Sequence, residues 1–187
     1  MTKKVKKIKT ACLIALLIFL TLPLKPVCAQ LSEYILKAVF LERFARFIEW
    51  PEESELTDYS KPFIIAIIGE DPFGPDLEKI YSTQKIRNKR VEIRYISHAN
   101  AIDECHMLFI SRDQKRDLSE IIAKTRDKPI LTVADTKGFA DNGVYINFYL
   151  EKTMLRFEIN ASAVKKSKLR MSYMLLQQAR IVGSLKE

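Results

Sequence analysis

The sequence predicts a three-layer α/β domain, with a mixed, mostly parallel central sheet of about six strands flanked by helices. Strand-like and helix-like segments alternate from residue 31 to residue 133, an order typical of parallel sheets with helical crossovers. Two strand-like segments, 144–149 and 154–159, then follow across a short connection. The domain is therefore expected to end in a β-hairpin and a C-terminal helix.

The first half of the domain begins with a helix. Apolar side chains recur at helical spacing over residues 31–50, and Pro51 ends the segment because the residue before a proline is disfavoured in helical geometry. The run 63–68 is apolar throughout, which predicts a strand buried on both faces of the sheet. A turn at 69–74 and a short helix over 75–82 are expected next.

The second half repeats this alternation. Apolar and charged residues alternate over 91–95, which predicts a strand with one face in solvent. The apolar runs 107–110 and 129–133 predict two more buried strands, with a polar helix over 113–125 between them. A last helix is predicted over 172–185.

Residues 1–29 differ in composition from the rest and predict a signal peptide. Lysines precede an apolar run over 11–22, and Val27-Cys28-Ala29 provides short side chains before a cleavage site. The run is shorter than the roughly 20 residues of a membrane-spanning helix. We therefore expect export to the periplasm, cleavage near Ala29 and a single domain over 30–187. An uncleaved N-terminal anchor is the alternative.

The charge balance changes once this segment is set aside. The chain carries 31 basic and 23 acidic residues, a formal net charge of +8. Six of the lysines lie in residues 1–29, so residues 30–187 carry 25 basic and 23 acidic residues, or +2. A strongly basic domain would suggest a nucleic-acid partner. Because the charges of residues 30–187 nearly balance, we expect no nucleic-acid partner.

The cysteines and histidines do not predict a metal site. Cys105 is the only cysteine in residues 30–187, so no internal disulfide is expected. Cys105 and His106 are neighbours, and neighbours on a strand point to opposite faces. Zinc sites need at least three protein ligands, so we expect neither a metal nor another cofactor.

The sequence also predicts no catalytic residues. Ser162 and Lys165 match the Ser-x-x-Lys of acyl-serine enzymes, but the companion motifs of those enzymes are absent. The turn at 69–74 lacks the third glycine of a dinucleotide fingerprint and the Gly-Lys-Ser/Thr of a P-loop. His98 and His106 are the only histidines, which leaves few candidates for a Ser/His/Asp site. A binding protein is favoured over an enzyme.

Candidate binding residues come from two arguments. Open α/β sheets bind ligands at the carboxyl ends of their strands, where the expected loops place two acids and two phenylalanines. Arginines grip carboxylates and phosphates with a planar fork, although ordinary surface ion pairs are the alternative. The candidates for ligand or partner contact are Arg46, Trp50, Asp71, Phe73, Asp135, Phe139, Arg156 and Arg170.

Several blocks of the chain, in order, resemble the YfiR/HmsC-like family of periplasmic proteins. They are AVFLERFARFIEWP at 38–51, IGEDPFG at 68–74, CHMLFIS at 105–111, LTVAD at 131–135 with Gly138-Phe139, RFEIN at 156–160, and Leu175, Leu176 and Ala179. The chain departs from the family pattern where Asn142-Gly143 replaces a Gly-Gly pair and Ser167-Lys168 replaces Ala-Gly.

The resemblance implies a function. It implies a periplasmic repressor that binds the sensor region of an inner-membrane diguanylate cyclase and holds the cyclase inactive, which lowers cyclic di-GMP and biofilm formation. It also implies a homodimer, since family members tend to dimerise, and some members respond to redox state or small ligands. With Cys105 alone, a redox response would not act through an internal disulfide. The alternative is a periplasmic small-ligand receptor that feeds a sensor kinase or a transporter.

Overall fold

The computed structural model describes residues 27–102 and 104–183, with side chains from residue 33 onward. The chain divides into two units, Met1–Gln30 and Leu31–Glu187, and the second carries the fold. Residues 1–26, which make up most of the predicted signal peptide, lie outside the described residues. Within the described part, no helix has the length and apolar character to cross a membrane.

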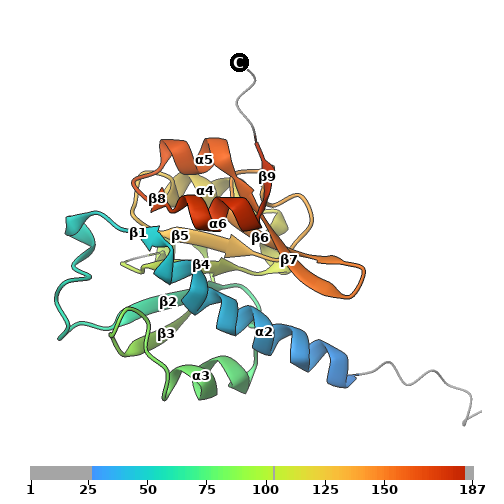
Figure 1. The fold of residues 1–187 in the computed structure, drawn as a ribbon, viewed down its shortest axis with the longest axis horizontal. Coiled ribbons are helices and arrows are strands. Elements are labelled where there is room, and N and C mark those ends of the chain that lie inside the picture. The colour runs from blue at the N-terminus through green and yellow to red at the C-terminus, as the bar shows by residue number, and fades with distance from the viewer. Residues whose placement is uncertain (1–26, 103, 184–187) are drawn as a thin grey trace, which may run out of the picture. The chain divides into compact units, whose positions relative to one another are not determined.

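The centre of the domain is a seven-stranded sheet (Figure 1). Its strands are β2 (Phe63–Ile68), β3 (Val91–Ile96), β4 (Met107–Ile110), β5 (Leu131–Ala134), β6 (Ile146–Glu151), β7 (Met154–Asn160) and β9 (Arg180–Val182). Their order is β3-β2-β4-β5-β6-β7-β9, and all neighbours are parallel except β6 and β7. The predicted mixed, mostly parallel sheet is therefore confirmed.

Helices and short irregular elements surround the sheet. The α-helices of the described residues are α2 (Val27–Arg46), α3 (Pro75–Tyr81), α4 (Leu118–Thr125), α5 (Ala161–Lys166) and α6 (Tyr173–Gln178). Three 3-10 helices add η1 (Glu52–Ser54), η2 (Ala99–Ala101) and η3 (Arg112–Lys115). A separate two-stranded sheet pairs β1 (Ile48–Glu49) with β8 (Arg170–Met171).

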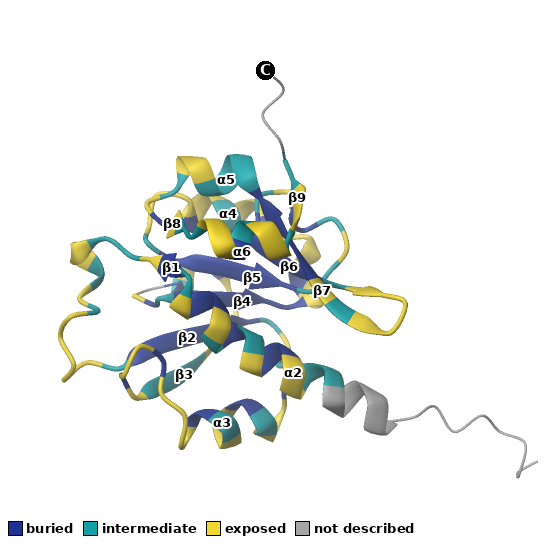
Figure 2. Cartoon of the chain, in the orientation of Figure 1, coloured by how far each residue is buried: buried dark blue, intermediate teal, exposed yellow. Residues whose placement is uncertain are grey.

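Strand β2 shows why the domain has three layers. All six of its residues are buried, as the apolar run predicts (Figure 2). Phe63, Ile65 and Ile67 belong to the core cluster under α2, α3 and α6. The alternate residues Ile64, Ala66 and Ile68 belong to a second cluster under α4 and η2. Because successive side chains point to opposite faces, an apolar strand joins both clusters.

Helix α2 crosses one face of the sheet from end to end. The Tyr34 hydroxyl donates to Asp135, directly after β5, whereas Trp50, just past the helix, contacts Phe63 at the start of β2. The helix therefore runs opposite to the parallel strands. Near its C-terminal end, the Phe44 ring lies 5.3 Å from the Phe148 ring.

The structure corrects several element boundaries. Helix α2 ends at Arg46 and α6 at Gln178, both earlier than predicted, and the polar helix is divided into η3 and α4. Beyond α6 the chain is extended, with Ala179 at φ −98° and ψ 152°, and β9 pairs with β7. The Arg180 side chain bonds to the carboxylate of Glu158 across these strands, a long-range contact that helical spacing cannot reveal.

Candidate functional site

The carboxyl ends of three parallel strands meet under the first half of α2. Gly69, Ser111 and Asp135 directly follow β2, β4 and β5, whose last residues are partners in the sheet. The chain passes from β2 to β3 on one side and then to β4 on the other. This reversal is a topological switch point, the place where open α/β sheets bind ligands.

A buried ion pair fixes α2 over this switch point. The Lys37 ammonium lies 2.6 Å from Asp135 Oδ2, and the two side chains are 3% and 8% exposed. Tyr34 donates to the same carboxylate oxygen at 2.8 Å, and Glu33 lies 2.7 Å from the Lys37 ammonium. Burial and the neighbouring Asp135 raise the pKa of the Tyr34 phenol above its ordinary value.

Phe73 fills the space beside this ion pair. It is buried, and its ring centroid lies 5.5 Å from that of Tyr34 and 4.8 Å from that of Phe109. The Asp71 carboxylate accepts from the Phe73 N–H at 2.9 Å, and burial raises the Asp71 pKa. Asp71, Phe73 and Asp135 therefore lie at one edge of the sheet, where Phe73 packs against Tyr34 and Asp135 pairs with Lys37.

The other candidates lie elsewhere. Phe139 is buried in the core cluster under α4. Arg46 is exposed and pairs with Glu42 at 2.7 Å, whereas Arg156 is exposed on β7 and lies 3.5 Å from Glu151.

Trp50 and Arg170 lie beyond the C-terminal end of α2. The Trp50 ring packs edge-on against Phe63 at 5.8 Å, and its indole N–H has no hydrogen-bond partner among the described residues. Arg170 is exposed on β8, opposite Glu49 of β1. The candidate residues therefore do not form one site.

Sequence reasoning missed a charged cleft at the amino ends of the strands. It has a volume of about 760 Å³. The side chains around it mix both charges and include Glu53, Glu55, Lys61, Glu92, Arg94, Glu104, His106 and Lys128. The rule that open α/β sheets bind ligands at the carboxyl ends of their strands does not point to this edge.

His106 connects the segment before β2 to the sheet. Its Nδ1 accepts from the Ile64 N–H at 3.0 Å, so Nε2 carries the proton and donates to the Ser54 carbonyl at 3.1 Å. The ring stacks on Phe63 with centroids 4.8 Å apart. Burial lowers the His106 pKa below its ordinary value, so the neutral imidazole is favoured.

We expect His106 to make stability depend on pH. Because its folded pKa is lowered, its stabilising contribution is complete above the unfolded pKa of 6.5 and is lost as pH falls through the lowered value. One such group changes the free energy of unfolding by at most about 1.4 kcal/mol per pH unit. Urea unfolding between about pH 7 and pH 5 should show a smaller decline for His106→Gln than for the natural chain. Parallel declines would contradict this role.

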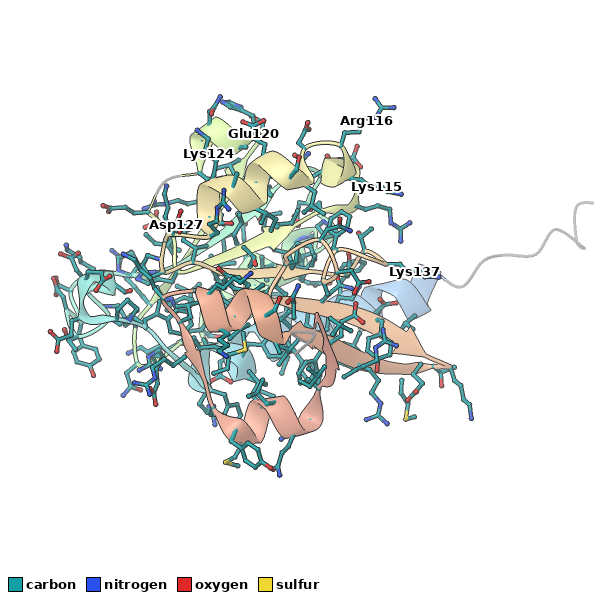
Figure 3. All side chains as sticks on the ribbon, turned by 90° about the horizontal axis from the view of Figure 1, so that it is seen from above. Lys115, Arg116, Glu120, Lys124, Asp127 and Lys137 are labelled. Carbon is teal, nitrogen blue, oxygen red and sulfur yellow. The ribbon has the colours of Figure 1, made fainter. Side chains whose placement is uncertain are left out.

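The two outer helical faces differ in character. Charged side chains of η3 and α4, among them Lys115, Glu120 and Lys124, point away from the sheet in Figure 3. On the opposite side, exposed apolar side chains come from α2, α6 and the β6–β7 hairpin. They are Ile35, Leu36, Val39, Leu150, Tyr173 and Met174, and we call them the apolar face.

The domain matches a known protein family over most of its length. Residues 34–180 match the family model described as YfiR/HmsC-like. The chain belongs to the YfiR/HmsC-like family. Family members are known for periplasmic regulation of diguanylate cyclases, and the family is a regulatory one. No curated protein matches the chain significantly.

The YfiR/HmsC-like match includes most of the features described above. It runs from Tyr34, in α2, to Arg180, the first residue of β9, and includes all the candidate residues. Tyr34 and Lys37 fall within it and are the residues that sequence reasoning missed at the switch point.

Proposed function

We propose that this YfiR/HmsC-like chain is a periplasmic regulatory protein that represses a membrane-bound diguanylate cyclase. It would bind the sensor region of the cyclase outside the inner membrane and so lower cyclic di-GMP. The family match over residues 34–180 carries the proposal. The predicted signal peptide supports the location, because it would place residues 30–187 in the periplasm.

The apolar face supports a protein partner. Large side chains such as Tyr173, Met174 and Leu150 are more than half exposed, although apolar surface of this kind is favourable to bury. Between α2 and α6, Phe40 and Phe47 line a cavity of about 170 Å³ together with Arg43 and Arg46. An aromatic surface with arginines at its border is typical of protein interfaces.

Repression requires only a difference in affinity. The protein would bind the inactive state of the cyclase more tightly than the active state and shift the equilibrium between them. A tenfold difference in affinity corresponds to about 1.4 kcal/mol. A small molecule that competes for the same surface would release the cyclase, and no catalytic residue or cofactor of this chain takes part.

We also propose that the protein acts as a homodimer. Most soluble oligomers are two-fold symmetric, so each face of one copy would recur on the other. Two copies would then present two cyclase-binding surfaces.

Deleting the gene tests the function in cells. We expect cyclic di-GMP to rise several-fold, and expression of the whole chain to restore the original level. A chain without residues 1–29 should fail to restore it, because it would stay in the cytoplasm. The effect should also disappear in a strain that lacks the regulated cyclase. An unchanged cyclic di-GMP level, or complementation by the chain without residues 1–29, would refute the proposal.

The cleft at the amino ends of the strands favours a second candidate, a small-ligand receptor that feeds a sensor kinase or transporter. Its volume of about 760 Å³ falls within the range of small-molecule sites. A solute that binds there would raise the melting temperature by mass action, and substitution of Arg94 would reduce that rise. If a panel of periplasmic solutes leaves the melting temperature unchanged, this candidate fails.

A further inference from the structure

Strand β7 lacks a neighbour along part of one side. It pairs with β6 along its full length on the other side. The short strand β9 pairs only with residues 158–160. Among the described strands, none pairs with residues 154–157 on that side. The β6–β7 hairpin also extends past the end of β5, so this stretch lies at the border of the sheet (Figure 1).

The register identifies the backbone groups on this open side. Glu151 and Met154 are partners across the hairpin turn, and Asn160 N–H donates to the Tyr145 carbonyl at 3.0 Å. Alternate residues of an antiparallel strand bond to the same neighbour. The even-numbered residues of β7 therefore bond to β6, and the N–H and C=O of Leu155 point away from it.

The two faces beside Leu155 have different chemistry. On the face under α2, Leu155 is the cross-strand partner of Leu150, which is 52% exposed, and the Phe157 ring contacts Phe40. On the other face, Arg156 is exposed on β7 and Arg180 begins β9. A strand added beside Leu155 would have apolar neighbours on one face. On the other face it would meet two guanidinium groups, which also lie against the Glu151 and Glu158 carboxylates.

We propose that the open edge of β7 at residues 154–157 binds an extended segment of the partner by strand addition, with alternating apolar and acidic side chains in that segment. The acids would lie near Arg156 and Arg180, and the apolar side chains beside Leu155 and Phe157. Strand addition supplies affinity through the main chain and specificity through alternate side chains. That this segment belongs to a cyclase sensor rests on the proposed function.

A second copy of the chain fits this edge less well. Antiparallel pairing about Leu155 would place Arg156 of one copy opposite Met154 of the other. The two arginines would then be diagonal neighbours, and like charges at such short range are destabilising. The opposite edge strand, β3, is also a weaker candidate because Glu92 and Arg94 form an ion pair along it at 2.7 Å, and edge charges discourage pairing.

Nuclear magnetic resonance with a designed peptide tests this edge directly. The ¹⁵N-labelled protein, purified from the periplasm, is titrated with a short blocked peptide in which valine and glutamate alternate. We expect the Leu155 amide signal to move downfield and saturate as its N–H gains an acceptor. A matched peptide with lysine in place of glutamate should bind at least about fivefold more weakly, because Arg156 and Arg180 repel it.

Two substitutions of Leu155 distinguish the contribution of its backbone N–H to peptide binding from that of its side chain. Leu155→Pro removes the outward N–H but no bond to β6, so the fold should persist while peptide binding is lost. Leu155→Ala keeps the N–H and should retain binding within about threefold.

Several results would overturn the proposal. In the titration, these are an unchanged Leu155 amide signal, chemical-shift changes centred on β3, or equal affinity for the two peptides. Peptide binding that survives Leu155→Pro would also overturn it, as would a Leu155 shift that changes with protein concentration in the absence of peptide. Because the peptide has no cyclase sequence, its failure would not bear on the proposed function.

Discussion

Replacing Asp135 with alanine should lower the free energy of unfolding by about 3 kcal/mol. The Lys37 ammonium beside it is almost fully buried, so the substitution would leave this cation with Glu33 as its remaining carboxylate partner. The Tyr34 hydroxyl would lose its acceptor as well. Removing one partner of a buried ion pair costs more than the pair itself contributes, because the remaining charge stays desolvated. Urea unfolding followed by circular dichroism measures the change.

Two further variants make this result specific. Glu42→Ala removes the pair with exposed Arg46 and should cost less than about 1 kcal/mol. A double variant, Lys37→Met with Asp135→Leu, should regain most of the loss because it buries no unpaired charge. If Asp135→Ala costs no more than Glu42→Ala, then the ion pair does not anchor α2.

Replacing Phe44 with alanine should lower the free energy of unfolding by about 4 kcal/mol. The Phe44 side chain is 1% exposed, and its ring lies 5.0 Å from the Phe157 ring and 5.3 Å from the Phe148 ring. Truncation would leave a cavity between α2 and the β6–β7 hairpin, and the cost of lost contacts adds to that of lost burial. The same urea titration measures it.

Val39 provides the matched control on the same helix. It belongs to the apolar face and is 38% exposed, so Val39→Ala should cost less than about 1 kcal/mol. If the apolar face contacts the partner, this variant should instead weaken cyclase binding. Equal losses of stability for Phe44→Ala and Val39→Ala would show that α2 is not anchored through its inner face.

The layered fold could be predicted because its strands are locally distinctive. Residues 63–68 and 107–110 are apolar throughout, a composition typical of strands buried on both faces and not of solvent-facing strands or surface helices. The β6–β7 hairpin was equally clear, since two β-rich segments flank a short connection.

The C-terminal strand could not be predicted in the same way. Leu175, Leu176, Ala179 and Val182 keep helical spacing, so local periodicity continues past the true end of α6 at Gln178. What ends the helix is non-local, because Arg180 bonds to Glu158, 22 residues away in the sequence. Pairing of this kind has no signature within a short window.

The switch point was predicted by a rule of topology, but its chemistry was not. Asp71 and Asp135 were expected at the strand ends, and the structure places them there. Lys37 and Tyr34 were missed because they lie 98 and 101 residues from Asp135 and read as part of an amphipathic helix. Of the residues predicted at the strand ends, Asp135 pairs with Lys37 of that helix and Phe73 packs against Tyr34.

Reconstitution of the cyclase tests repression most directly. The cyclase whose deletion abolishes the cellular effect is placed in liposomes with its sensor region outside, and the purified exported protein is added. The account predicts a saturable fall of about tenfold or more in the rate of cyclic di-GMP synthesis. An unchanged rate at protein concentrations that saturate the sensor region, or no binding to it, would contradict the account.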